Sequence, residues 1–515
     1  MTWPSSTRCP NRSAPVTETD ELTALAARVV MASFPGAVLP DWMRRRLGDG
    51  LGSVCLFGSN VDGPAQVADL TTAIHAAGSE VLTATDEEGG DVTRLHRRTG
   101  SPHPGNAALG AVDDVALTEA VAGEIGAELV SAGIDLNLAP VVDVNSNPDN
   151  PVIGVRSFGA DPRLVARHTT AYVVGMQASG VGACAKHWPG HGDTAVDSHL
   201  GLPVVDASPE ELRRRELVPF AAAVKAGTAA VMTSHVLLTA VDAEFPATLS
   251  AAAVDLLRED LGFDGLLVSD AIDMAAIKAG RGEPAVAVRA LAAGVDLLCL
   301  GADKDELLFD AVVAAIVAAV RAGDLTEGRL LEAAGTVLAC SRRVQEWRRT
   351  AMSRVPGPTV NGFFAGPPVT ASQQVADRAL RVRGDVPPLK GAIVLRFHTG
   401  TNMAVGEVPW GVLENGVVIA PDRMVDVGPE DAEELLLPKT DGTPAVALVR
   451  DLHRHAWVSE AVHALAARRP ELVVVEMGWP GEQPLPGSAS VFTYGAGRGN
   501  AKALDALLAN GSGPR

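Results

Sequence analysis

The chain lacks the features that would place it in a membrane or among nucleic-acid-binding proteins. No run of about 18 apolar residues occurs, so no transmembrane helix is predicted. Basic residues are few, since 43 Lys and Arg stand against 62 Asp and Glu, and the net charge is −19. An acidic chain is poorly suited to nucleic acid or to an anionic membrane surface. We therefore expect neither as a partner.

The chain is also poor in cysteine and lacks the pattern of an export leader. It has five cysteines, an odd number, and no CxxC pair. Cys55, Cys184 and Cys299 each lie in an apolar run, where a free thiol packs as a small hydrophobe. Residues 1–20 are polar and rich in Pro and Ser, with no basic stretch followed by an apolar core. These patterns predict a disordered tail at 1–20, reduced thiols and a cytoplasmic location.

Short apolar runs alternate with longer helical patterns over residues 21–347. Uninterrupted apolar runs are typical of strands buried on both faces, as in a parallel sheet. Eight such strands are expected, at Ala27–Phe34, Leu51–Phe57, Val81–Asp86, Ile134–Leu138, Val181–Lys186, Ala229–His235, Gly265–Asp270 and Val295–Leu300. Eight strand–helix repeats predict an α/β fold with a (β/α)8 TIM-type barrel, and the alternative is an open, doubly wound sheet.

Capping patterns mark the helices between these strands. Asp161 and Pro162 suit the N-cap and first turn of one helix. Ser208 and Glu211 form a capping-box pattern at the start of a helix that we expect to end near Gly227. A further helix is indicated by an apolar stripe that recurs every four residues, Leu117, Val121, Ile125 and Leu129.

The periodicity stops over residues 348–370, where clustered Pro and Gly indicate a linker. A second α/β pattern follows over residues 371–515. It comprises a helix at Ala371–Leu380 and strands at Gly391–Phe397, Ala445–Val449, Leu472–Met477 and Ser490–Tyr494. We expect a smaller three-layer α/β sandwich domain. No phosphate-binding glycine motif follows its strands, so we assign it no chemistry.

Polar residues gather where the predicted barrel strands end, which is where barrel enzymes keep their active sites. The candidates are Asp86, Arg94, Asn137, Asp143, Arg156, Lys186, His187, His191, Asp193, Asp197, His199, His235 and Asp270. A single polar residue at a strand end can have a purely structural role, but the same pattern at the ends of several strands is harder to explain in that way. We therefore expect the active site at this end of the barrel.

The loop after the fifth predicted strand is rich in His and Asp. One interpretation is a zinc site with ligands drawn from His187, His191, Asp197 and His199. Pro189 argues against it, because it breaks the helical spacing between the first two histidines. The second interpretation is acid/base chemistry by His199, with Asp197 holding its ring. The third is a loop held together by side-chain hydrogen bonds, which we prefer for His191.

Asp270 ends the apolar run Gly265–Asp270, which carries no other charge. A carboxylate at a barrel-strand end can be a nucleophile, a base, a ligand or a helix N-cap. Asp273 could serve as the cap instead. Lys186 also directly follows an apolar strand, where it can bind a substrate hydroxyl or pair with a buried carboxylate such as Asp86.

Seven segments carry a family resemblance. They are TDEEGG followed by Arg94, NLAPVVDV, IGVRSFG, KHWPGHGDTAVDSHLGLP, VMTSH, PATLS and VSDAIDM. Together they resemble glycoside hydrolase family 3, in its β-N-acetylhexosaminidase branch, over about residues 25–345. The family's barrel agrees with the fold predicted from the repeats. Glu87 stands where Gln is usual and Trp188 where Phe is usual. The C-terminal part resembles the second domain of the longer members.

The resemblance implies roles for individual residues. Asp270 resembles the catalytic nucleophile, and Asp197 with His199 resembles the acid/base dyad of this branch. The terminal sugar would be bound by Asp86, Arg94, Arg156, Lys186 and His187. Family 3 β-glucosidases lack the Asp-Ser-His element, so its presence points to the N-acetylglucosaminidase branch. No metal and no cofactor is expected.

The implied activity is that of a retaining exo-β-N-acetylglucosaminidase with a covalent glycosyl-enzyme intermediate. Its expected partner is a small carbohydrate, either a peptidoglycan fragment or a chito-oligosaccharide. One alternative is a phosphorylase with the same Asp nucleophile and His acid/base. A non-catalytic sugar-binding protein is a second alternative, although it would need neither Asp270 nor the dyad. A metal-dependent hydrolase is a third, and a chelator would reveal it.

Overall fold

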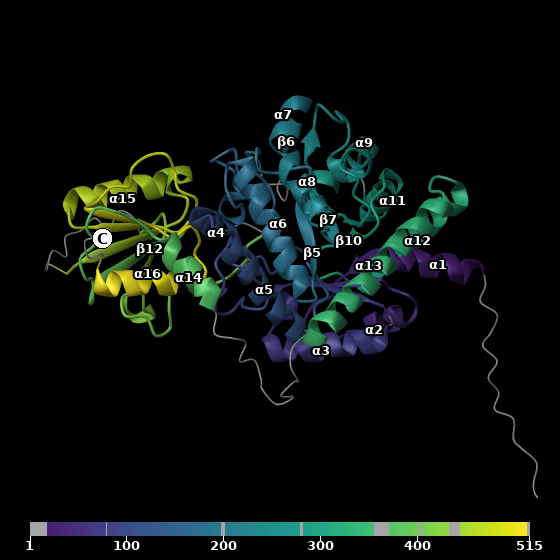
Figure 1. Ribbon diagram of the computed structural model, residues 1–515, viewed down its shortest axis with the longest axis horizontal. Coiled ribbons are helices and arrows are strands. Elements are labelled where there is room, and N and C mark those ends of the chain that lie inside the picture. The colour runs from purple at the N-terminus through teal and green to yellow at the C-terminus, as the bar shows by residue number, and fades with distance from the viewer. Residues whose placement is uncertain are drawn as a thin grey trace, which may run out of the picture.

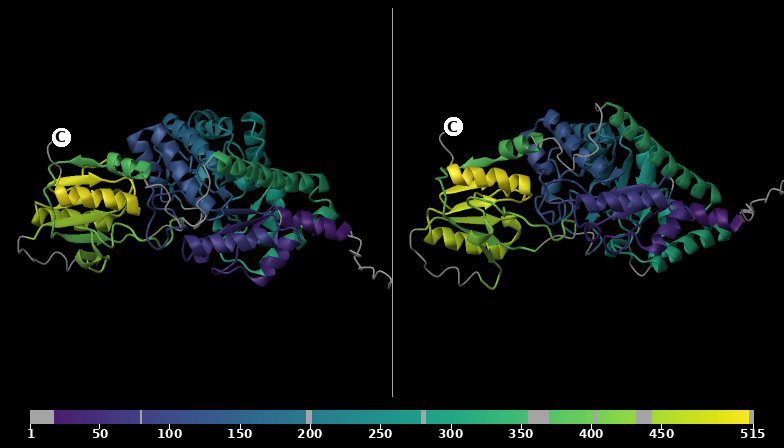
Figure 2. Two further views of the ribbon diagram at one scale, coloured as in Figure 1. Left: turned by 60° about the horizontal axis from the view of Figure 1, so that its bottom comes forward. Right: turned by 90° about the horizontal axis from the view of Figure 1, so that it is seen from below.

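The computed structural model describes residues 18–78, 80–196, 201–278, 282–354, 370–400, 404–431 and 443–511. A barrel and a C-terminal domain lie side by side along the long axis of the molecule (Figures 1 and 2). Over the ranges described, no helix has the length and apolar character needed to cross a membrane.

The barrel consists of eight parallel strands that close into a ring. They are β1 (Val30–Ala32), β2 (Ser53–Leu56), β3 (Leu82–Thr85), β4 (Leu136–Asn137), β5 (Gly182–Trp188), β7 (Ala230–Thr233), β9 (Leu266–Val268) and β10 (Leu298–Cys299). They pair in the order β10-β1-β2-β3-β4-β5-β7-β9. A parallel bridge between Val268 and Leu297 and a 2.9 Å bond from the Ser269 N–H to the Leu297 carbonyl join β9 to the β10 segment. The predicted barrel is confirmed, and the open sheet is excluded.

Helices surround this ring, and one or more of them lies between most consecutive strands along the chain (Figure 1). They are α1 (Glu18–Arg28), α2 (Asp41–Gly48), α3 (Pro64–Ala77), α4 (Asn106–Val112), α5 (Val115–Ser131), α6 (Pro162–Ala178), α7 (Pro209–Arg214), α8 (Leu217–Lys225), α9 (Ala251–Asp255), α10 (Ala275–Lys278), α11 (Glu283–Ala293), α12 (Glu306–Ala322) and α13 (Glu327–Arg354). A short parallel pair outside the ring, β6 (Val204–Val205) and β8 (Leu237–Leu238), has no counterpart in the sequence-based prediction.

Capping decides where several of these helices begin. At α7 the Ser208 N–H donates to the Glu211 carboxylate at 2.9 Å, and the Glu211 N–H donates to Ser208 Oγ at 3.2 Å. The helix predicted to continue from there to Gly227 is instead two helices, α7 and α8. Pro219 explains the break, because a residue without an N–H is tolerated in the first turn of α8 but not inside a longer helix.

The interior of the barrel is a packed apolar cluster. Cys55, Cys184 and Cys299 lie in it as buried free thiols, as expected from their apolar runs. Helix α13 adds Val337 and Val344 to the same cluster. The barrel is therefore a filled core, and room for a ligand is left where its strands end.

The C-terminal domain is a six-stranded sheet between helices. Its strands are β11 (Arg381–Arg383), β12 (Ile393–Phe397), β13 (Met424–Val427), β14 (Ala445–Val449), β15 (Val473–Glu476) and β16 (Ala489–Phe492), in the order β11-β16-β15-β14-β12-β13. All pairs are parallel except β11 with β16. Helices α15 (Ala456–Arg468) and α16 (Arg498–Asn510) cover opposite faces (Figure 1). This is the predicted three-layer sandwich, with two edge strands more than predicted.

The ends of three helices lie close to the predicted domain boundaries. Helix α1 begins at Glu18, within the predicted tail, and α13 reaches Arg354, within the predicted linker. Helix α14 (Thr370–Ala379) begins the C-terminal part and packs against α4, α5 and α16. Residues 1–17 and 355–369 lie outside the described part. The boundaries at 20, 347 and 370 stay predictions.

Candidate active site

A cavity of about 220 Å³ lies at the end of the barrel where the parallel strands finish. Its ionisable lining residues are Asp86, Glu88, Arg94, Arg156, Lys186, His187, His191, Asp270 and Asp273. Six of these carry roles implied by the family resemblance: Lys186 and His187 lie in the last part of β5, and the other four come from the loops after β3, β4 and β9. Two further residues with roles implied by the resemblance, Asp197 and His199, lie outside the described residues.

A larger groove of about 1100 Å³ lies elsewhere, where α14 and α16 meet the loop after β3. Its lining includes Arg98, Gln373, Asp377, Arg498 and Lys502. The smaller cavity gathers ionisable groups from several strand ends, which the chemistry of a barrel enzyme requires. We therefore place the candidate active site in the smaller cavity, at the strand ends.

Lys186 is the centre of a buried ion-pair network in this cavity. Its Nζ lies 2.7 Å from Asp86 Oδ1 and 2.7 Å from Glu88 Oε1. Arg156 donates to both Glu88 oxygens, from Nε at 3.0 Å and from Nη2 at 2.8 Å. Arg94 Nη2 lies 3.4 Å from Asp86 Oδ2. Three cations therefore surround two carboxylates, and the network offers donors and acceptors to sugar hydroxyls.

In this network the neighbouring charges affect the pKa of each buried group more than burial does. Burial alone would raise the pKa of Asp86, but Lys186 and Arg94 hold that pKa below its usual value. Burial acts in the same way on Glu88, and Arg156 with Lys186 holds its pKa well below the usual range. Burial would lower the pKa of Lys186, but the two carboxylates raise it. All of these groups are therefore charged at neutral pH.

His187 is oriented by Asp143. Its Nδ1 lies 2.7 Å from Asp143 Oδ2, and Arg156 Nη2 lies 3.4 Å from its Nε2. A guanidinium can only donate, so Nε2 accepts and Nδ1 carries the proton. Asp143 also accepts the His191 N–H at 2.7 Å, so it ties the two ends of the turn after β5 together.

His191 lines the cavity and is also bonded within its own loop. Its Nδ1 lies 2.9 Å from Thr194 Oγ1. Burial lowers the pKa of His191 to about 4, although the Asp143 charge acts in the opposite direction. The ring is therefore neutral at physiological pH. This agrees with our preference for a loop held by side-chain hydrogen bonds.

Asp270 follows β9 and borders the cavity. Its Oδ1 accepts the N–H of Ala271 at 2.7 Å. The next helix, α10, begins at Ala275, so Asp270 is not the cap of a described helix. Asp273 is paired with Lys304, whose Nζ lies 2.5 Å from Asp273 Oδ2.

Some predicted candidates support the site from outside the cavity. Asn137 accepts the Glu87 N–H at 3.0 Å and donates to the Glu87 carbonyl at 2.9 Å, which fixes the loop after β3. His235 Nε2 lies 2.9 Å from the Ala271 carbonyl, beside Asp270. Asp193 is paired with Arg215.

Two contributors to the site were missed by sequence analysis. Glu88 was not singled out, although it pairs with both Arg156 and Lys186. Ala404, from the C-terminal domain, lines the cavity, and its carbonyl accepts from Arg94 Nη2 at 3.0 Å. The run of three acidic residues in the DEEGG motif was a signal for a further carboxylate beside Asp86, whereas nothing in the sequence pointed to Ala404.

The C-terminal domain is attached to the rim of the barrel near this cavity. Asp91, which is 7% exposed, lies 2.5 Å from Arg450 Nη2 and accepts the Ala496 N–H at 2.7 Å. His453 Nε2 lies 2.9 Å from the Pro148 carbonyl. These contacts hold the C-terminal domain, which carries Ala404, against the barrel.

Comparison with known proteins identifies the family of this chain. Residues 44–340 match the model of the glycosyl hydrolase family 3 N terminal domain. Over 270 residues the chain is 40% identical to beta-hexosaminidase A of Pseudoalteromonas piscicida, an alignment that covers 48% of this chain and 45% of that protein. Over 277 residues it is 40% identical to a beta-hexosaminidase of Stenotrophomonas maltophilia (strain R551-3), covering 52% of this chain and 81% of that protein.

A solved structure matches nearly the whole chain. It is a glycoside hydrolase family 3 beta-N-acetylglucosaminidase from Paenibacillus sp. str. FPU-7, with a TM-score of 0.83 and 32% identity. The match covers 95% of this chain and 96% of that one, so it includes both the barrel and the C-terminal domain. The protein therefore belongs to glycosyl hydrolase family 3 and is a glycoside hydrolase.

Proposed function

We propose that the protein is a retaining exo-β-N-acetylglucosaminidase that releases terminal β-linked GlcNAc from small glycosides. The observation that carries the proposal is the position of Asp270 in one cavity with Asp86, Arg94, Lys186 and Arg156. Relatives named beta-hexosaminidase, and a similar structure described as a beta-N-acetylglucosaminidase, support the choice of sugar.

The ion-pair network would bind the terminal sugar. Arg94, Arg156 and Lys186 are donors, and Asp86 is an acceptor, so vicinal hydroxyls can bridge them in place of water. The carbonyl of Ala404 fixes Arg94, which limits the geometry that the sugar can adopt. Because the cavity is small, about 220 Å³, and lies among strand ends, it suits the end of a glycan rather than its middle.

Chemistry would begin at Asp270. One of its carboxylate oxygens attacks the anomeric carbon while the bond to the leaving oxygen breaks, and His199 gives its proton to that oxygen. Neutral His199 then takes a proton from water, which attacks the same carbon and releases Asp270. The roles of His199 and Asp197 rest on the family motif that contains them.

The proposed substrates are cytoplasmic, either peptidoglycan fragments ending in GlcNAc or chito-oligosaccharides. Four cysteines in the described residues, Cys55, Cys184, Cys299 and Cys340, are free and buried. Buried thiols of this kind fit a reducing compartment.

A panel of aryl β-glycosides of GlcNAc, GalNAc, glucose and xylose, assayed with and without phosphate, tests the proposal. We expect the highest kcat/KM with the GlcNAc glycoside and free GlcNAc as product in the absence of phosphate. Millimolar phosphate should change the rate by less than about threefold, which corresponds to about 0.65 kcal/mol in activation free energy. A large acceleration with GlcNAc-1-phosphate as main product would identify a phosphorylase. No turnover of any of the four glycosides would contradict the proposal.

A further inference from the structure

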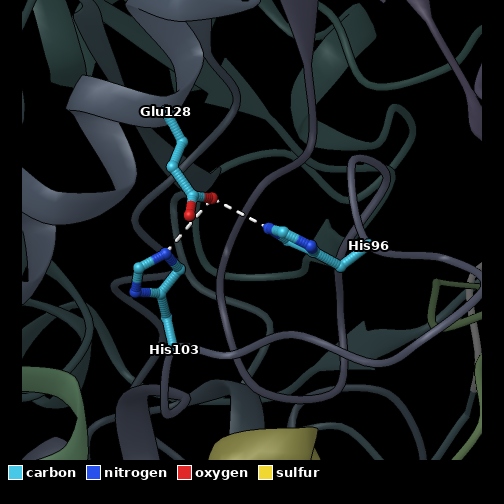
Figure 3. Close-up of side chains that lie close together, drawn as sticks. All are labelled: His96, His103 and Glu128. Carbon is cyan, nitrogen blue, oxygen red and sulfur yellow. Dashed lines mark hydrogen bonds and ion pairs between the residues drawn. The ribbon is translucent and has the colours of Figure 1, made fainter. Parts of the chain in front are cut away.

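Two histidines and a carboxylate converge outside the active site, where the barrel meets α14. His96 and His103 lie on the loop between β3 and α4, and Glu128 lies on α5 (Figure 3). His96 Nε2 is 2.8 Å from Glu128 Oε2, and His103 Nε2 is 3.3 Å from the same oxygen. One ligand atom from each residue lies within 4.8 Å of the other two.

Hydrogen bonds on the far side of His103 decide where its proton lies. Ser372 Oγ donates to Glu124 Oε2 at 2.5 Å, because an ionised carboxylate can only accept. The same Oγ therefore accepts from His103 Nδ1, which is 2.8 Å away. In a neutral ring, Nδ1 then carries the proton and Nε2 presents its lone pair to Glu128.

That lone pair faces an acceptor in a buried place. His103 is 1% exposed, and its Nε2 makes no hydrogen bond in the described structure, although Glu128 Oε2 is 3.3 Å away. Two acceptors facing each other are unfavourable unless a cation lies between them. The positive charge between His103 Nε2 and Glu128 can be supplied by a second proton on the ring or by a metal ion.

We propose that His96, His103 and Glu128 bind a divalent first-row metal ion, with Zn²⁺ as the best match. Imidazole nitrogen and carboxylate oxygen are zinc ligands, and bond lengths of about 2.0–2.2 Å place the donors of a tetrahedral site roughly 3.3–3.5 Å apart. The 3.3 Å separation between His103 and Glu128 fits, whereas His96 Nε2, which donates to Glu128 at 2.8 Å, would give up its proton and move about 0.5 Å away as the ion binds. The chain from His103 through Ser372 to a carboxylate is the outer support that metal-binding histidines have.

The position of the cluster indicates a structural role. Glu124 also accepts the N–H groups of Ala371 at 2.9 Å and Ser372 at 3.2 Å, at the start of α14. A metal on His103 would therefore hold the beginning of the C-terminal part against α5. Side-chain exposure of 14% for His96 and 28% for Glu128 leaves a route from solvent. The sequence-based expectation of no metal rested on the histidines after β5 and would be revised.

Metal binding to the full chain, stripped with a chelator and then titrated, tests the proposal. We expect one tightly bound Zn²⁺ that raises the midpoint of thermal unfolding, and a visible d–d spectrum typical of tetrahedral Co²⁺ when Co²⁺ replaces it. His103→Ala and Glu128→Gln should lose this ion. Ser372→Ala should weaken binding about 10- to 100-fold, as loss of an outer hydrogen bond does. His75→Ala, which breaks the separate 2.8 Å pair with Asp135, should leave it unchanged.

The outcomes are independent of enzyme activity, so they do not depend on the proposed function. Absence of stoichiometric Zn²⁺ and of the Co²⁺ spectrum in the unaltered chain would overturn the proposal. Undiminished binding in both ligand variants would also overturn it, because the ion would then lie elsewhere. If His103→Ala does not fold, Ser372→Ala and Glu128→Gln decide the question.

Discussion

Glu88→Gln should destabilise the protein strongly, because Glu88 is the carboxylate shared by Arg156 and Lys186. It accepts from Arg156 at 2.8 and 3.0 Å, and Lys186 lies 2.7 Å away. The three side chains are at most 5% exposed. Glutamine keeps the shape and one acceptor but removes the charge that both cations face.

The magnitude follows from burial. Removing one partner from a buried ion pair typically costs about 3–5 kcal/mol. Lys186 keeps Asp86, at 2.7 Å, so we expect the lower end, about 3 kcal/mol of unfolding free energy at pH 7. The Arg156 and Lys186 charges outweigh burial and hold the pKa of Glu88 below its usual value. Its stabilising contribution is therefore present above the unfolded pKa of about 4.3 and is lost as pH falls towards the folded pKa.

Urea unfolding of the wild type and of two matched variants at pH 7 and near pH 3 measures this effect. Glu87→Gln is the control, since Glu87 is also buried but binds the N–H groups of Arg94 and Leu95, both at 2.9 Å. Glutamine can accept both bonds, so we expect a loss below about 1 kcal/mol. The Glu88→Gln deficit should shrink on acidification. Equal losses in the two variants, or a deficit that does not change with pH, would refute the reasoning.

Three further predictions follow from the site. Asp143→Asn should lower kcat/KM at least about tenfold with little change in folding, because the carboxylate that fixes the tautomer of His187 is lost; unchanged kinetics would contradict this. Arg450→Met leaves the buried Asp91 carboxylate unpaired and should cost about 3–5 kcal/mol, measured as a lower unfolding midpoint and faster proteolysis between barrel and C-terminal domain; an unchanged midpoint would contradict it. His199→Ala should slow glycosides with poor leaving groups by about 10²–10⁴-fold and activated aryl glycosides much less; equal loss across leaving groups would argue for a binding role.

The barrel could be predicted because its strands are buried on both faces. β5, for example, is a buried strand over its whole length, Gly182–Trp188, and gives a continuous apolar signal up to Ala185. The missed strands give no such signal. β11 is three residues long with an exposed arginine at each end, and β13 carries the exposed Val425 and Asp426. Such short, half-exposed segments are specified by their neighbours in the sheet, which the local sequence does not encode.

The site was predictable where residues lie at or just after the end of a strand. Lys186 lies in the last part of β5, Asp270 comes two residues after β9, and both border the cavity. On an irregular loop no periodicity tells which of two adjacent buried residues faces the cavity, so Glu87 and Glu88 could not be distinguished. Ala404 contacts Arg94 from 310 positions away, through the docking of a second domain. A contact of that kind depends on tertiary packing and leaves no local pattern.

The identity of the nucleophile is the central claim, and covalent trapping tests it most directly. A slow 2-fluoro glycosyl donor should inactivate the enzyme and leave one sugar on the peptide that contains Asp270, as peptide mass spectrometry would show. Asp270→Ala should remain folded, lose turnover by several orders of magnitude and acquire no label. A label on another carboxylate, such as Asp86 or Asp273, or full activity of Asp270→Ala, would contradict the account.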